Sequence, residues 1–148
     1  MDIRKANPSE IDSIVTFQQK MAMETESLEL DTAILTKGVQ AVFDDSSKGI
    51  YYVAIEDEKT IASLLITYEW SDWRNGQVYW IQSVYVLPEH RGKGVYKQMY
   101  LHLKEEVEKS PNIRGLRLYV EKDNQIAQKV YSKLGMDGEH YKMFEWMK

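Results

Sequence analysis

The spacing of hydrophobic residues along this chain alternates between a two-residue period and a helical period, which predicts a mixture of strands and helices. Strand-forming segments are expected at 3–6, 51–56, 60–70, 77–87 and 114–120, and the tail at 141–146 has the pattern of a last strand. Apolar residues at helical spacing occur at 11–21, 34–43, 95–107 and 127–134. The order of these elements predicts an α/β (α+β) fold in which helices flank a mixed sheet.

Local signals support these boundaries. Asn7-Pro8-Ser9-Glu10 is a typical helix start, with proline and an acidic residue in the first turn. The polar turn Asp57-Glu58-Lys59 joins two strands that are expected to be antiparallel, and 77–87 returns as the third. The strand at 114–120 is expected to run parallel to 77–87, because a helix connects them.

The strand at 77–87 leads through a basic, glycine-containing turn into a helix. Pro88 ends strand pairing, Gly92 and Gly94 permit a tight turn, and helical spacing begins at Val95. The first amides of such a helix lack intrahelical acceptors and lie at the positive end of the helix dipole. A diphosphate fits this position, and the side chains that add positive charge are Arg91, Lys93 and Lys97.

Two common nucleotide-binding motifs do not match this turn. A P-loop ends in Gly-Lys followed by Ser or Thr, whereas Gly94 is followed by Val95 and Tyr96. A dinucleotide-binding fingerprint requires a further glycine at position 97, which is Lys97.

A second strand, turn and helix follow at 116–136. Ala127, Val130, Tyr131 and Leu134 lie on one face of the expected helix, and Gly135 is placed to end it. From Asn124 onward the segment has the pattern N-x-x-A-x-x-x-Y-x-x-L-G-M.

Together these two motifs resemble the GNAT superfamily, the acyl-CoA-dependent N-acetyltransferases. The turn matches the family pattern Q/R-x-x-G-x-G/A with Arg91 and Gly94, but Tyr96 stands where the family usually has Gly or Ala. The helix from Asn124 is similar to the family's N-x-x-A-x-x-x-Y-x-x-x-G-F. The order and joint occurrence of both motifs make this resemblance more specific than either motif alone.

The resemblance implies a single GNAT-like domain over 1–148, with a mostly antiparallel sheet and a splayed parallel strand pair. It implies acetyl-CoA as co-substrate and no metal, with the pantetheine arm lying along the central strand like an added strand. The residues implied in binding CoA are Val84, Tyr85, Val86, Arg91, Gly92, Lys93, Gly94, Val95, Tyr96, Lys97, Asn124 and Tyr131.

In the family, the tyrosine at the position of Tyr131 is a general acid. A thiol has a reference pKa of about 8.5 and a phenol about 10, so a phenol can return a proton to the leaving thiolate. The structural alternatives are a core tyrosine for Tyr131 and a helix N-cap for Asn124.

The general base is not evident in the sequence. Many family members carry Glu at the position of Gln82, and an amide cannot take a proton near neutral pH. The alternative bases are Glu69, Glu121 and His140, with Glu24 and Glu26 as further candidates; otherwise the amine arrives already neutral. His140 is the only one that titrates near neutrality unperturbed, although a histidine in a polar loop is more often solvated.

Composition narrows the class of protein. The chain has 148 residues with 43% hydrophobic content and no cysteine, which excludes disulfides, a thiolate metal site and a cysteine acyl-enzyme. A net charge of −4 with interleaved acidic and basic residues argues against nucleic-acid binding. Without a long apolar run or a signal peptide, no membrane partner is expected, and we expect a cytoplasmic protein.

The acceptor side is less specific. Glu24, Glu26, Trp70, Trp73 and Gln82 are candidates for binding an amine, because carboxylates and aromatic rings attract cations. The alternative readings are a solvated acidic turn for the glutamates and an Asn-Gly hairpin whose tryptophans cover the sheet edge.

The sequence therefore predicts direct transfer of an acetyl group from acetyl-CoA to a primary amine of an unidentified acceptor, either a small molecule or a protein N-terminus or lysine. A main-chain amide near Val84 is expected to hold the carbonyl oxygen during attack. The alternative is a CoA-binding regulatory or interaction module with the same fold and little or no catalysis. A homodimer is consistent with the family.

Overall fold

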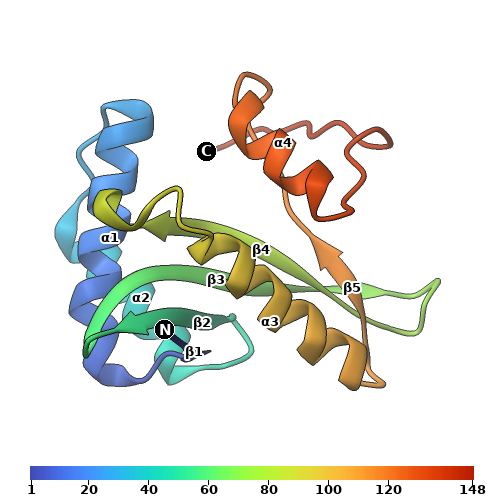
Figure 1. The fold of residues 1–148 in the computed structure, drawn as a ribbon, viewed down its shortest axis with the longest axis horizontal. Coiled ribbons are helices and arrows are strands. Elements are labelled where there is room, and N and C mark those ends of the chain that lie inside the picture. The colour runs from blue at the N-terminus through green and yellow to red at the C-terminus, as the bar shows by residue number, and fades with distance from the viewer. The chain divides into compact units, whose positions relative to one another are not determined.

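The strands expected from the sequence form one five-stranded sheet in the order β1-β2-β3-β4-β5 (Figure 1). The computed structural model describes all residues from Met1 to Lys148. The first three pairings are antiparallel and β4 pairs with β5 in parallel, which confirms the mixed α/β fold. The strands are β1 (Asp2–Lys5), β2 (Ile50–Glu56), β3 (Lys59–Ser71), β4 (Gly76–Val86) and β5 (Ile113–Arg117).

The four α-helices also lie close to their expected positions. They are α1 (Ile11–Glu26), α2 (Thr32–Asp44), α3 (Val95–Lys109) and α4 (Gln125–Lys133). None of them combines the length and apolar composition that crossing a bilayer requires. The chain divides into two compact units, Met1–Arg117 with the sheet and three helices, and Leu118–Lys148 with α4.

A capping box starts the first helical segment. The Asn7 side chain accepts a hydrogen bond from the Ser9 amide, and the Glu10 carboxylate accepts one of 2.7 Å from the Asn7 amide. Glu10 is buried, and Arg4 of β1 donates to it at 2.5 and 3.1 Å. Burial alone would raise the pKa of Glu10, but the Arg4 and Asn7 hydrogen bonds outweigh it and lower the pKa.

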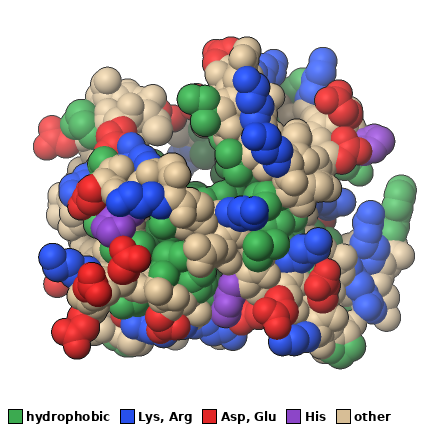
Figure 2. Space-filling view, in the orientation of Figure 1, with side chains coloured by type: hydrophobic (Ala, Val, Ile, Leu, Met, Phe, Trp, Pro, Cys, Tyr) green, Lys and Arg blue, Asp and Glu red, His purple; other side chains and the backbone are tan.

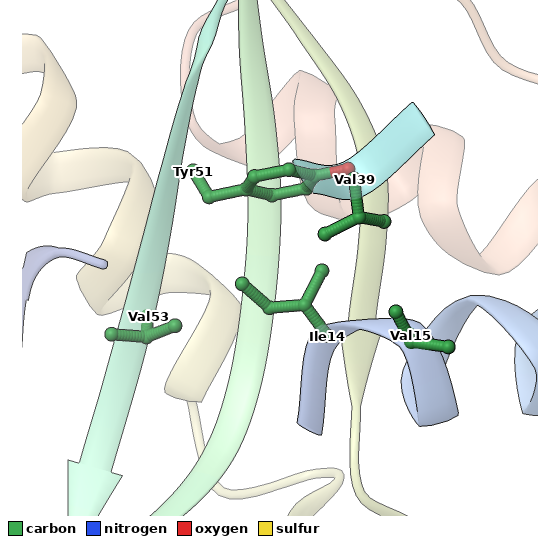
Figure 3. Close-up of a cluster of buried hydrophobic side chains, with 5 residues drawn as sticks. All are labelled: Ile14, Val15, Val39, Tyr51 and Val53. Carbon is green, nitrogen blue, oxygen red and sulfur yellow. The ribbon is translucent and has the colours of Figure 1, made fainter. Parts of the chain in front are cut away.

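One face of the sheet is covered by α1 and α2. Figure 3 shows Ile14 and Val15 of α1 and Val39 of α2 gathered against Tyr51 and Val53 of β2. Residues two apart on a strand share a face, which explains why alternate residues of β2 enter this cluster. Ile14 is completely buried, and burying such a side chain stabilises the fold by about 1.5–3 kcal/mol.

The opposite face of the sheet packs against α3. The hydroxyl of Tyr52 donates a 2.5 Å hydrogen bond to Glu106 of α3, and its ring lies edge-on to His102. Met99 and Leu103 of α3 are buried as the helical period predicts. The helix that follows the glycine turn is therefore fixed on the sheet, and so is the direction of its N-terminus.

Arg114 ties the tip of the β3–β4 hairpin to the start of β5. Its guanidinium donates to the carbonyl oxygens of Arg74, Asn75 and Pro111 at 3.0, 3.3 and 2.7 Å. Gly76 leaves room for this contact, because a Cβ at that position would lie 2.7 Å from the Arg114 side chain. The two parallel strands are thus held together at this end.

The C-terminal part departs from the sequence-based expectation. The strand expected at 114–120 ends at Arg117, and the last strand expected at 141–146 is wrong, because no strand follows α4. Strand-forming residues need a partner with free main-chain groups, and composition does not reveal whether one is available. In the tail, Phe144 and Trp146 are 94% and 86% exposed instead of packing on a sheet.

Candidate active site

The turn between β4 and α3 leads directly into the N-terminus of a helix. Pro88–His90 forms one 3-10 turn, and Gly92 and Gly94 follow with φ of 71° and 77°. The first helical hydrogen bond of α3 runs from the Gln98 amide to the Gly94 carbonyl at 3.0 Å. The amides of the first turn, Val95 to Lys97, precede this bond and lie at the positive end of the helix dipole.

The space over the two glycines is open. A Cβ built on Gly92 or Gly94 meets no heavy atom within 4 Å, and both residues are exposed. Their left-handed backbone is one that glycine adopts without steric cost. The turn therefore combines helix-start amides, positive charge from Lys93 and Lys97, which are also exposed, and room for an anion. Tyr96 is half-buried.

Beyond Trp80, β4 has no strand partner on the β5 side. The parallel pairing joins Gln77–Trp80 of β4 to Ile113–Arg117 of β5 and then stops. This confirms the splayed strand pair that the sequence predicted. From Ile81 to Val86 the only strand that pairs with β4 is β3, and on the other edge the Val86 carbonyl accepts from Arg91. The remaining main-chain groups of that edge have no strand partner within the sheet, which suits an extended ligand.

A β-bulge changes which side chains share a face of β4. Leu65 pairs with Gln82 and Ser63 with Tyr85, so two residues of β4, Ser83 and Val84, lie opposite one residue of β3. Ser83 has a left-handed φ of 53°. Because of the extra residue, Gln82 and Tyr85 lie on the same face although they are three apart. The Val84 region, predicted to bind the carbonyl oxygen, is therefore irregular backbone.

Side-chain hydrogen bonds link β3, β4 and β5 on the face that also carries α1 and α2. The Gln82 side-chain amide donates to the Thr67 hydroxyl at 2.7 Å. One step along, Glu69 accepts from Trp80 at 3.3 Å and from Arg117 in an ion pair. Both carboxylate oxygens of Glu69 thus accept from a side chain, Oε1 from Trp80 and Oε2 from Arg117.

Arg91 is folded back onto β4 and α1. Its Nε donates to the Val86 carbonyl at 2.8 Å and its NH2 donates to Glu24 at 2.7 Å. Its guanidinium carbon lies 5.2 Å from the centre of the Tyr85 ring, and the Tyr85 hydroxyl donates to Glu24 at 2.7 Å. Hydrogen bonds from Tyr85 and then Arg91 lower the pKa of Glu24, whereas burial and this carboxylate raise the pKa of Tyr85 to about 12.

The other predicted residues belong to the second unit and are described within it. Asn124 caps α4, because its side chain accepts a 3.1 Å hydrogen bond from the Ala127 amide. Tyr131 is half-buried, and burial raises the pKa of its phenol. Glu121 is exposed, and His140 is an exposed side chain that lies 3.0 Å from Asp137.

The remaining acceptor-side candidates are exposed. Glu26 lies in the last turn of α1. Trp70 and Trp73 are 63% and 92% exposed, so Trp73 does not cover the sheet edge. In Figure 2, Lys and Arg side chains are interspersed with Asp and Glu, and this face carries no continuous basic surface.

Sequence reasoning missed three of these arrangements. Thr67 and Arg117 were not among the candidates, although each contacts one. Opposite charges on the strands of Glu69 and Arg117 were visible, but the register that brings them together was not. The pairing of Glu24 with Arg91 was also missed, because 67 residues separate them.

Comparison with known proteins places this geometry in a family. The model described as "Acetyltransferase (GNAT) family" matches residues 17–136. A structure described as a possible acetyltransferase from Clostridium difficile 630 has 45% sequence identity and a TM-score of 0.92, over 99% of this chain and 97% of that chain. A search of curated proteins found no match.

Two more distant structures share the fold. A predicted acetyltransferase with acetyl-CoA from Clostridium acetobutylicum has 22% identity and a TM-score of 0.75, over 97% of this chain and 95% of that one. AAC(6')-Iy in complex with a bisubstrate analogue, CoA-S-monomethyl-acetylneamine, has 17% identity and a TM-score of 0.77, over 99% and 97%. The family match spans most of the sequence and includes both motifs, so this chain belongs to the acetyltransferase (GNAT) family.

Proposed function

We propose that this protein transfers an acetyl group from acetyl-CoA to a primary amine. The observation that carries the proposal is the open edge of β4 leading directly into the glycine turn and the N-terminus of α3. An extended pantetheine arm fits the strand edge, and a diphosphate fits the helix-start amides. The structure with acetyl-CoA from Clostridium acetobutylicum shares this fold, which supports the same co-substrate here.

Each part of the bound co-substrate has a candidate partner in this chain. The amides of Val95, Tyr96 and Lys97 would hold the diphosphate, and the open space over Gly92 and Gly94 would admit it. Main-chain groups after Trp80 would hold the pantetheine arm, with the bulge at Ser83–Val84 directing an amide toward the thioester oxygen. The thioester supplies the activated acyl group.

The proposed reaction uses one side chain of this protein, Tyr131, for proton transfer. The Tyr131 phenol would protonate the departing thiolate, because burial keeps it in its acid form at neutral pH. No carboxylate occupies position 82, and Glu69 is paired with Arg117. We infer that the amine attacks in its neutral form, with Gln82 accepting an N–H hydrogen bond through the carbonyl that the Thr67 contact leaves available. The nitrogen loses its extra proton to solvent after attack, and solvent reprotonates the Tyr131 phenolate once the thiol has formed.

Calorimetric titration with acetyl-CoA tests the proposal. Binding in the micromolar range is expected, with much weaker binding of pantetheine, which lacks the diphosphate. A spectrophotometric assay of CoA release across primary amines would then identify the acceptor class. Absence of binding at millimolar acetyl-CoA would reject the enzyme and leave a regulatory or interaction role as the better hypothesis.

A further inference from the structure

Three side chains join the end of α1 to the glycine turn between β4 and α3. Glu24 lies in the last turn of α1, Tyr85 lies on β4, and Arg91 follows β4. Both carboxylate oxygens of Glu24 are used, Oε1 by the Tyr85 hydroxyl and Oε2 by Arg91, each at 2.7 Å. Phe17 of α1 packs on the same Tyr85 ring with centroids 5.3 Å apart. We call Glu24, Tyr85 and Arg91 the α1 clamp.

The position of Glu24 on its helix is electrostatically unfavourable without these partners. The last carbonyl groups of a helix create a negative potential, which repels a carboxylate in the final turn. The Arg91 guanidinium and the Tyr85 hydroxyl compensate for that repulsion. The last turn of α1 is therefore held to the sheet by the α1 clamp as well as by its apolar face.

The segment beyond Glu24 connects α1 to α2. Ser27 ends α1 in a left-handed conformation, residues 28–31 have no regular structure, and Asp31 caps α2. One hydrogen bond, from Gln19 to Thr32 at 3.0 Å, joins α1 to the start of α2. Exposed apolar side chains lie along this connection, with Met23 at 50%, Leu28 at 46% and Ile34 at 72%.

We propose that Glu24 is a positioning residue that fixes residues 24–32 relative to the glycine turn. Glu24 then acts on the acceptor through this segment and does not touch the acceptor itself. The inference rests on the proposed function for its kinetic consequence. Glu24 was a candidate for direct contact with the amine, but its two oxygens already have donors. The contacts of Arg91 use Nε and NH2, so NH1 remains available for a phosphate oxygen.

Hydrogen exchange of the free protein tests the positioning role without any substrate. In Glu24→Gln, the amides of residues 24–28, which are hydrogen-bonded within α1 or to its last carbonyls, are expected to exchange about fivefold faster, because a charged hydrogen bond and an ion pair are lost. Tyr85→Phe should act on the same segment, and the double variant should exchange no faster than Glu24→Gln alone. Glu29→Gln, an exposed carboxylate in the same connection, is the matched control and should match wild type.

Kinetics separates positioning from direct contact. Glu24→Gln should raise the KM of the amine about fivefold and change the acetyl-CoA dissociation constant by less than about twofold. A higher KM with unchanged exchange would overturn the proposal and indicate that Glu24 touches the acceptor. Unchanged exchange with unchanged KM would also overturn it. If the wild type fails to bind acetyl-CoA, the proposed function falls, while the exchange result still decides whether Glu24 holds the segment.

Discussion

The phenol of Tyr131 is suited to protonating a thiolate because its environment keeps it protonated. Burial raises its pKa above the ordinary value, so ionisation is suppressed throughout the neutral range. Removing the hydroxyl in Tyr131→Phe is expected to lower kcat about 100-fold and to leave acetyl-CoA affinity nearly unchanged. Calorimetry and steady-state kinetics measure the two quantities.

An exposed tyrosine of the same unit provides the control for this substitution. Tyr141 is 83% exposed, and Tyr141→Phe should have wild-type turnover. If Tyr131→Phe loses acetyl-CoA affinity as much as turnover, Tyr131 serves binding or packing instead of proton transfer.

A substitution at position 82 tests whether the amine arrives already neutral. With Gln82, kcat/KM should rise with pH until the acceptor amine is deprotonated, because no carboxylate takes the proton. Gln82→Glu supplies a base that is ionised above about pH 4.3. The ratio of kcat/KM at pH 7 to kcat/KM at pH 9 should therefore increase at least about tenfold over wild type. The pH profile of kcat/KM with a responsive amine measures this ratio.

A glutamate elsewhere on the same strand tests whether the effect is local. Gln77 is exposed at the start of β4, and Gln77→Glu should leave the pH profile unchanged. An identical profile for Gln82→Glu and wild type would show that position 82 does not contact the amine.

At the residue scale, the sequence identified chemistry better than contacts. The glycines of the turn and Asn124 were recognised because backbone conformation and helix capping are local. The α1 clamp and the pair of Glu69 with Arg117 were not, because they join segments that are distant along the chain. The left-handed Ser83 carries no signal either, since that conformation usually selects glycine, asparagine or aspartate.

Among the elements, the glycine turn makes the sharpest prediction. Gly94→Ala puts a methyl group on a backbone with φ of 77°, which costs about 1–2 kcal/mol in the free energy of unfolding. The methyl group would also occupy the open space over the helix-start amides, so acetyl-CoA affinity should fall more than about tenfold, beyond what lost stability explains. Urea unfolding and calorimetry measure the two effects.

Gly38 offers a matched comparison within α2. Its added Cβ also meets nothing within 4 Å, but its backbone is helical and not left-handed. Gly38→Ala should therefore stabilise the protein by about 0.5–1 kcal/mol and leave affinity unchanged. Wild-type acetyl-CoA affinity in Gly94→Ala would mean that the diphosphate does not lie over this turn.

The elements themselves were largely predictable, and the exceptions share a cause. Helices and the antiparallel strands follow from periodicity and local turn residues, as at Asp57 and Glu58, where positive φ values of 48° and 63° make the tight turn. The strand at 114–120 was overestimated and the tail strand at 141–146 was wrong. Both expectations required a pairing partner, which local pattern does not provide.

For the whole molecule, ionisable groups predict a stability that declines at both ends of the pH range. Glu10 and Glu24 have lowered pKa values, and hydrogen bonds from Ser47 and Lys48 lower that of Asp45 to about 2. A carboxyl group whose pKa is lower in the folded than in the unfolded protein stabilises the fold at pH values above its unfolded pKa. This stabilisation is therefore complete above about pH 4.5 and is lost as pH falls toward 2.

At alkaline pH the stability depends on buried tyrosines, whose pKa values are raised and not lowered. Burial raises the pKa of Tyr51 to about 12, and burial together with Glu24 does the same for Tyr85. Their contribution is complete below pH 10 and is lost as pH rises toward 12. Urea unfolding across this range measures both limbs, and Tyr51→Phe should reduce the alkaline loss. An unchanged alkaline limb in that variant would contradict the assignment.

The short pairing between β4 and β5 places function and stability in opposition. Arg114 joins the two strands at one end, and their ladder stops at Trp80 and Arg117. Additional rungs would strengthen the sheet and would use the same main-chain groups that an extended co-substrate needs. Changes that make this protein more stable by lengthening β5 should therefore make it a poorer enzyme. Laboratory selection for heat resistance alone would favour inactive variants in which β5 pairs with β4 along its whole length.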